Sequence, residues 1–174
     1  MGTSCKTKRA ALRRSAPVIL VTVGTQLPFD RLIQAMDALA PSLGEPVFAQ
    51  VGRGEFRPLN MEWQATLDAS EFDRLLKEAS VIVSHAGTGT ILLAQGMRKP
   101  LVIMARRSAL GEHRNDHQVA TAKQMAGRPG VHVAESSDDL ALAISIAAGE
   151  TVEAAIPSQR ERLKAAIREF VGSR

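Results

Sequence analysis

The sequence is poor in aromatic residues, with no tyrosine, one tryptophan and an aromatic content of 3%. Modules that stack nucleic-acid bases need aromatic platforms, so we expect no nucleic-acid partner. Cysteine is equally scarce: Cys5 stands alone, which excludes a disulfide scaffold and favours a reducing, cytoplasmic setting. No apolar run approaches the roughly 20 residues that span a bilayer, so the sequence predicts no transmembrane helix.

The composition is that of an ordinary globular domain with one basic end. The 174 residues, of which 45% are hydrophobic and 23% charged, suit a single domain. The net charge of +4 originates at the N-terminal end, which holds no acid but carries Lys6, Lys8, Arg9, Arg13 and Arg14. We therefore expect a basic flexible tail over 1–16, a domain over 17–150 and a C-terminal helix within 151–174.

Apolar runs alternate with helical periodicities along the domain. Short β-branched runs indicate strands buried on both faces, and apolar residues three or four apart indicate helices. The expected strands cover 17–23, 46–51, 63–67, 81–83, 101–104 and 131–133. The expected helices cover 29–40, a segment capped by Ser70, 88–97, 113–125, 138–148 and 158–171. This alternation predicts an α/β, Rossmann-like, mostly parallel sheet with helices on both faces, whose ligands bind at the carboxyl ends of the strands.

The strongest chemical signal is the tract Ser84-His85-Ala86-Gly87-Thr88-Gly89-Thr90, which joins a predicted strand to a predicted helix. Glycines at such a junction let a phosphate approach the backbone, and the first helical N–H groups carry positive partial charge. The two threonines add hydroxyl donors. The competing interpretation is a tight turn that needs glycine only for its backbone conformation.

A second polar tract, 111–118, follows the next strand and should reach the same edge of the sheet. Its last four residues are Asn115, Asp116, His117 and Gln118. Side chains of this kind suit hydrogen bonds to a sugar, and the alternative is a solvated loop with a helix cap. His113 and His117 could share a helix face, but no third ligand is evident and the H-E-x-x-H order is absent, so we expect no metal.

Two further candidates should face the same cleft. Gly24 and Thr25 follow the first strand, where a plain turn explains them almost equally well. Arg106 and Arg107 suit a phosphate or carboxylate, or remain solvated. The G-x-S-x-G, Walker and G-x-G-x-x-G patterns are absent, which removes the main support for serine hydrolase, nucleoside triphosphatase and NAD-binding functions.

Three blocks in chain order resemble the carboxyl-terminal, donor-binding half of glycosyltransferase family 28. They are Val21-Thr-Val-Gly24-Thr25, Ser84-His-Ala-Gly-Thr-Gly-Thr-Ile-Leu92 with Lys99-Pro100 after it, and Asn115-Asp-His-Gln118. Within the family the chain is similar to the small catalytic subunits of two-component transferases, both bacterial exopolysaccharide enzymes and the eukaryotic dolichol-linked UDP-N-acetylglucosamine transferase. The resemblance implies one half of a GT-B fold that binds a UDP-sugar without a metal or cofactor.

The resemblance implies roles for His85, for Gly87 to Thr90, and for His117 and Gln118, and the residue patterns described above suggest the others. The nucleotide and its phosphates would be held by Gly24, Thr25, Gly87, Thr88, Gly89 and Thr90. The donor sugar would be contacted by Asn115, Asp116, His117, Gln118, Arg106 and Arg107, the two arginines serving a uronic acid if the sugar is glucuronic acid. His85 and His117 are the catalytic candidates. One position departs from the family, because Leu93 stands where a glutamate commonly grips the ribose.

The implied partners follow from the family as well. A complete GT-B enzyme has a second, acceptor-binding half, so we expect a membrane-anchored subunit that binds a lipid-linked glycan and recruits this chain to the inner face of the membrane. An apolar stripe in the last helix would dock that partner or pack on the chain's own sheet: Leu163, Ile167, Phe170 and Val171. The alternative functions are a non-catalytic nucleotide-sugar-binding module and a dinucleotide-dependent oxidoreductase.

Overall fold

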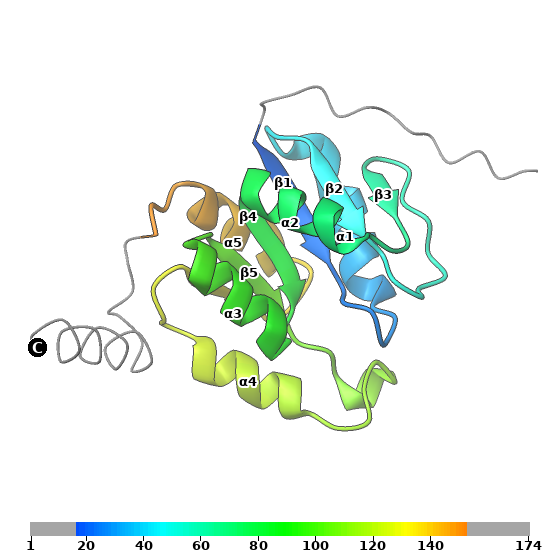
Figure 1. Ribbon diagram of the computed structural model, residues 1–174. Helices are drawn as coiled ribbons and strands as arrows, with labels where there is room; N and C mark the ends of the chain where they lie inside the picture. The colour runs from blue at the N-terminus through cyan, green and yellow to red at the C-terminus, as the bar shows by residue number, and fades with distance from the viewer. Residues whose placement is uncertain (1–16, 153–174) are drawn as a thin grey trace, which may run out of the picture.

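The computed structural model describes residues 17–152 (Figure 1). The predicted basic tail and the predicted last helix, with its possible partner dock, lie outside these residues. Six strands form one sheet in the order β3-β2-β1-β4-β5-β6, and all pairs are parallel. The strands are β1 (Val18–Thr22), β2 (Val47–Gln50), β3 (Glu62–Gln64), β4 (Ala79–His85), β5 (Leu101–Met104) and β6 (Val131–Ala134). This topology confirms the predicted Rossmann-like α/β fold.

Helices cover both faces of the sheet (Figure 1). The helices are α1 (Asp30–Leu39), α2 (Ala69–Glu78), α3 (Thr88–Met97), α4 (His117–Met125) and α5 (Asp139–Ala148), with short 3-10 turns η1 (Ala40–Ser42) and η2 (Ser108–Leu110). Successive strand side chains point to opposite faces, so Ile19 and Val21 join the core under α1 and α5, whereas Leu20 joins the core under α2 and α3. Within 17–152 no helix combines the length and the apolar character needed to cross a membrane.

The central strands bring three loops to one edge of the sheet. β4 lies between β1 and β5, and its register pairs Ser84 with Thr22 and His85 with Met104. Because the strands are parallel, the segments that leave their carboxyl ends start side by side. The loops after β1, β4 and β5 therefore surround one region of the surface.

Two predicted helix starts are wrong. Asp68 caps α2 in place of Ser70, because its carboxylate accepts hydrogen bonds from Glu71 N at 2.8 Å and Ser70 Oγ at 2.7 Å. These bonds, that from the Ser70 side chain first, lower the pKa of Asp68. The helix expected from residue 113 starts at His117, because Asp116 instead accepts bonds from Ser108 N and Oγ, both at 2.8 Å, and holds the preceding segment as a loop.

Candidate functional site

A cleft of about 410 Å³ lies where the loops after β1, β4 and β5 meet. Ten of the predicted site residues line it: Gly24, Thr25, His85, Gly87, Thr88, Gly89, Thr90, Arg106, His117 and Gln118. Among the residues of the described chain that line this cleft, none is acidic. The cleft is therefore suited to an anionic group.

One wall of the cleft is formed by the segment that joins β4 to α3, and the N-terminus of α3 faces into the cleft. The first intrahelical bond runs from Ile91 N to Gly87 O at 3.2 Å, so the N–H groups of Thr88, Gly89 and Thr90 precede it. A Cβ on Gly87 would lie 2.2 Å from Nε2 of His85, whereas a Cβ on Gly89 would meet no atom within 4 Å. The imidazole thus requires glycine at position 87, while the space beside Gly89 is open.

The imidazole of His85 lies between the glycines of two loops. A Cβ on Gly24, which has φ +75°, would approach Cε1 of His85 to 2.9 Å, and Gly87 also adjoins the ring. Burial, and secondarily the positive charge of Arg106, lower the pKa of His85 to about 4. His85 is therefore a neutral imidazole at pH 7 that can donate or accept one hydrogen bond in the cleft.

Arg106 lies at the base of the cleft and is 3% exposed. Its Nη2 donates to Val23 O and Leu27 O, both at 2.7 Å, and its Nε donates to Pro28 O at 3.2 Å. Burial lowers the pKa of Arg106 to about 10, which still leaves a cation at pH 7. Three of its donors are thus committed to carbonyls of the loop after β1.

The loop after β5 brings two histidines to the other wall. The rings of His113 and His117 meet edge to face with centroids 4.3 Å apart, and His117 Nδ1 is hydrogen-bonded to Asn115 Oδ1. Gln118 is buried, and its Oε1 accepts a bond from Arg106 N at 3.2 Å. His117 therefore reaches the cleft from an exposed position, whereas Gln118 also holds the start of α4 against β5.

Three predicted sugar-contact residues do not line the cleft. Arg107 is exposed and donates from Nη2 to Glu135 O at 2.7 Å. Asp116 holds Ser108, which lowers its pKa, and Asn115 supports His117 from outside the cleft. The expected pair of arginines is therefore split, because Arg106 is buried against the first loop and Arg107 faces the opposite side of its own loop.

Several functional candidates were missed by the sequence patterns. Gln26, Leu27 and Thr121 also line the cleft, as does His113, which was considered individually only as a metal ligand. Thr121 was accessible to prediction, since it lies one helical turn after His117 and donates from Oγ1 to its carbonyl at 2.9 Å. Leu93, by contrast, is not among the residues that line the cleft. Within the described residues no cluster of three or more potential metal ligands occurs.

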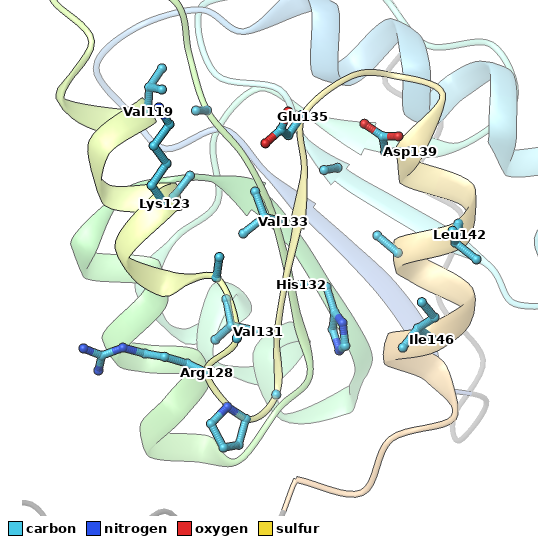
Figure 2. Close-up of a pocket in the computed structure, with 18 of the residues that line it drawn as sticks. Val119, Lys123, Arg128, Val131, His132, Val133, Glu135, Asp139, Leu142 and Ile146 are labelled. Carbon is cyan, nitrogen blue, oxygen red and sulfur yellow. The ribbon is translucent and has the colours of Figure 1, made fainter.

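A second and larger hollow, of about 1360 Å³, lies along β6 between α4 and α5. Figure 2 shows Val131 and Val133 pointing toward α4 and His132 toward α5. Leu142 and Ile146 on α5 are 66% and 51% exposed and form part of its wall. Asp116 and Arg107 line this hollow in place of the cleft, so the loop after β5 separates the two depressions.

Comparison with known proteins agrees with the fold and with the motif blocks. Residues 18–164 match the glycosyltransferase family 28 C-terminal domain. The human UDP-N-acetylglucosamine transferase subunit ALG13 is 36% identical over 118 residues, which are 62% of this chain and 10% of that protein. This chain thus spans about a tenth of the length of the curated relatives that it matches.

Solved structures show the same architecture. The calicheamicin glycosyltransferase CalG4 superposes with a TM-score of 0.63 at 19% identity, over 93% of this chain and 45% of that one. The solution structure of ALG13 superposes with a TM-score of 0.56 at 17% identity, over 79% of this chain and 88% of that one. The sheet is therefore one Rossmann-like half of a GT-B glycosyltransferase fold, and the chain belongs to the glycosyltransferase family 28 C-terminal domain family.

Proposed function

We propose that this chain is the donor-binding catalytic subunit of a two-component, membrane-associated glycosyltransferase. It binds a UDP-sugar in the cleft at the N-terminus of α3, and the sugar is transferred to a lipid-linked glycan. The observation that carries the proposal is the opening of this helix N-terminus into a cleft whose described lining contains three histidines, one arginine and no acid.

The proposed chemistry is electrostatic. The N–H groups of Thr88, Gly89 and Thr90 and the two threonine hydroxyls face the position of the diphosphate, which leaves with extra negative charge as the glycosidic bond breaks. Arg106 adds a fixed positive charge at the base of the cleft. Holding the donor in one orientation lowers the barrier further, because it removes translational and rotational freedom before the reaction. We propose that this proceeds without a metal or other cofactor.

The second component is proposed from the relatives. The human relative is named as a subunit of a UDP-N-acetylglucosamine transferase, and CalG4 has more than twice as much chain as the part that superposes on this domain. In our proposal a membrane-anchored partner binds the lipid-linked acceptor, supplies the general base and holds this otherwise cytoplasmic chain at the inner face of the membrane. Assembly of exopolysaccharide is the process in which we place it.

The identity of the donor sugar depends on which charged side chains reach the cleft. A glucuronic acid donor would need a cation for its carboxylate, and Arg106 and Arg107 do not form the expected fork, because they face opposite sides of their loop. The test therefore compares UDP-glucuronic acid with UDP-glucose and UDP-N-acetylglucosamine.

A second candidate function is a nucleotide-sugar-binding module without turnover. Leu93, 43% exposed on α3, favours it because a leucine offers the ribose no hydrogen bond. The two candidates share the donor site and differ only in transfer.

A thermal-shift and calorimetry panel tests the donor site. We expect UDP and at least one UDP-sugar to stabilise the protein, by about 2.7 kcal/mol at a free ligand concentration of 100 times Kd, and NAD to have no effect. Transfer of labelled sugar to lipid extracts in the presence of source membranes then separates the catalytic subunit from the module without turnover. Stabilisation by NAD but not by UDP would overturn both candidates.

A further inference from the structure

Two arginines from different segments meet at one phenylalanine beneath the cleft. Phe29, at the start of α1, is 1% exposed. The guanidinium carbon of Arg31 lies 5.2 Å from the centroid of its ring, and that of Arg106 lies 5.0 Å from it. Cation–π contacts of this kind attract both guanidinium groups to the ring, and hydrogen bonds from each group then set the directions of its donors.

Arg106, which follows β5, holds the loop after β1, and this loop forms one wall of the cleft. Its guanidinium donates to the carbonyls of Val23, Leu27 and Pro28. These carbonyls belong to a loop, so no strand or helix partner would replace the arginine. The planar fork of arginine presents donors in several directions at once, which the single ammonium of lysine does not. Arg106 therefore holds the loop on both sides of Gly24 and Thr25, while Gln50 Nε2 adds a single bond to Gly24 O at 3.0 Å.

Arg31, on α1, holds the loop after β5, which carries His113 and forms another wall of the cleft. Its Nε and Nη2 donate to Oε1 and Oε2 of Glu112 at 2.7 and 2.9 Å, and Nη2 also donates to Ala105 O at 2.9 Å. Glu112 in turn accepts a bond from Arg107 N at 2.9 Å. Glu112 directly precedes His113, so this two-pronged ion pair sets where the histidine loop starts.

We infer that Arg106 and Arg31 are positioning residues for the two walls of the cleft, each acting on one wall. Arg106 orders the loop after β1, which carries Gly24 and Thr25, through backbone carbonyls. Arg31 orders the histidine loop that faces the sugar through Glu112. The inference rests on the proposed function for the identity of the ligand. The two sets of contacts, those of Arg106 with the loop after β1 and those of Arg31 with Glu112, are present in the protein without ligand.

The test uses calorimetry with UDP and with the tightest binder among UDP-glucose, UDP-glucuronic acid and UDP-N-acetylglucosamine. Arg106→Lys should weaken UDP and the UDP-sugar together, by at least about tenfold, because it loses hydrogen bonds from a charged donor. Glu112→Gln should change the affinity for UDP by no more than about twofold, while it lowers the affinity for the UDP-sugar by about fivefold or more. Arg74→Gln, which removes an exposed pair with Glu78 on α2, is the matched control and should change neither.

A spectroscopic measurement separates positioning from a general loss of stability. In amide spectra of the unliganded protein, Arg106→Lys should shift the Gly24 and Thr25 signals, and Glu112→Gln should shift His113 while leaving Gly24 and Thr25 in place. If each variant shifts the signals of both Gly24–Thr25 and His113, or if Glu112→Gln lowers the affinity for UDP as much as that for the UDP-sugar, the inference is wrong. If the wild type binds no UDP, the proposed function fails. The amide shifts then still decide whether Arg106 and Arg31 each position their own loop.

Discussion

The imidazole of His85 occupies the space that a side chain at Gly87 would need, since a Cβ there would lie 2.2 Å from Nε2. A substitution at Gly87 would therefore displace the histidine and would not report on the phosphate alone. A Cβ added at Gly89 would have open space around it, and Gly89 lies on the same helix N-terminus. It is the cleaner position at which to test anion binding.

Gly89→Val is expected to lower the affinity for UDP by at least tenfold (about 1.4 kcal/mol), because a branched side chain would keep the diphosphate from the backbone N–H groups. The far-UV circular dichroism should stay that of the wild type. Gly96→Val is the matched control, because Gly96 lies on α3 away from the cleft and its Cβ would also meet open space. Unchanged UDP affinity in a folded Gly89→Val protein would remove this anion site.

The stability of the protein should fall as the pH is lowered from about 6.5 toward 4. The pKa of His85 is about 4 in the folded protein, against 6.5 for an unperturbed histidine, so the unfolded chain takes up a proton first. The contribution of His85 is therefore fully present above pH 6.5 and is lost as pH falls through 4. Urea unfolding at pH 7.5 and 5.0 should show a larger loss in the wild type than in His85→Asn. Equal losses in the two proteins would mean that His85 is not protected from protonation.

The strands were predictable because their sequences leave little choice. Residues 18–21 and 101–104 are continuously apolar and are buried throughout, as expected for the centre of a parallel sheet. The ends of the helices were less predictable, since Asp68 and Ser70 are both good capping residues and only the hydrogen bond to Glu71 N selects between them.

The site was predictable where backbone geometry determines it and unpredictable where side-chain direction does. The glycines after β1 and β4 reach one cleft because the carboxyl ends of parallel strands meet. Arg106 and Arg107 are adjacent and the backbone of Arg107 is extended, so alternation implies that the two side chains face opposite sides. Which one faces the cleft depends on Phe29 and the carbonyls after β1. The Arg31 and Glu112 pair joins residues 81 positions apart, and no local pattern indicates it.

His117 and Gln118 should differ in what they affect, although they are neighbours. His117→Ala removes an exposed side chain of the cleft, so it should lower the affinity for the UDP-sugar and leave the affinity for UDP unchanged. Gln118→Ala also removes the acceptor for Arg106 N, so it should cost about 1–3 kcal/mol of stability and weaken both ligands. Calorimetry with UDP and UDP-sugar, combined with urea unfolding, measures both effects. A Gln118→Ala protein of wild-type stability that loses only the sugar contact would contradict this distinction.

Asp37 should matter for stability and leave ligand binding unchanged. This buried carboxylate on α1 accepts bonds from Leu59 N at 3.0 Å and Asn60 N at 2.7 Å, and so fixes the segment before β3. Asp37→Ala should lower the free energy of unfolding by about 2 kcal/mol, with UDP affinity unchanged because this segment does not line the cleft. Asp73→Ala is the control, since its exposed pair with Lys77 should contribute less than about 1 kcal/mol. Equal effects of the two substitutions would show that the buried bonds add nothing.

The single chain should bind UDP yet transfer no sugar to a lipid-linked acceptor until a membrane-associated partner is added. An acceptor hydroxyl must lose its proton during transfer, and the described residues of the cleft offer no carboxylate for it. His85 is a poor base, because a pKa of about 4 leaves it little affinity for a proton at pH 7. The measurement follows labelled sugar into lipid extracts, with purified chain alone and with membranes from source cells that lack its gene. Transfer should require both and should disappear with Gly89→Val. Sustained transfer by the purified chain without membranes would overturn the two-component proposal while leaving the donor site intact.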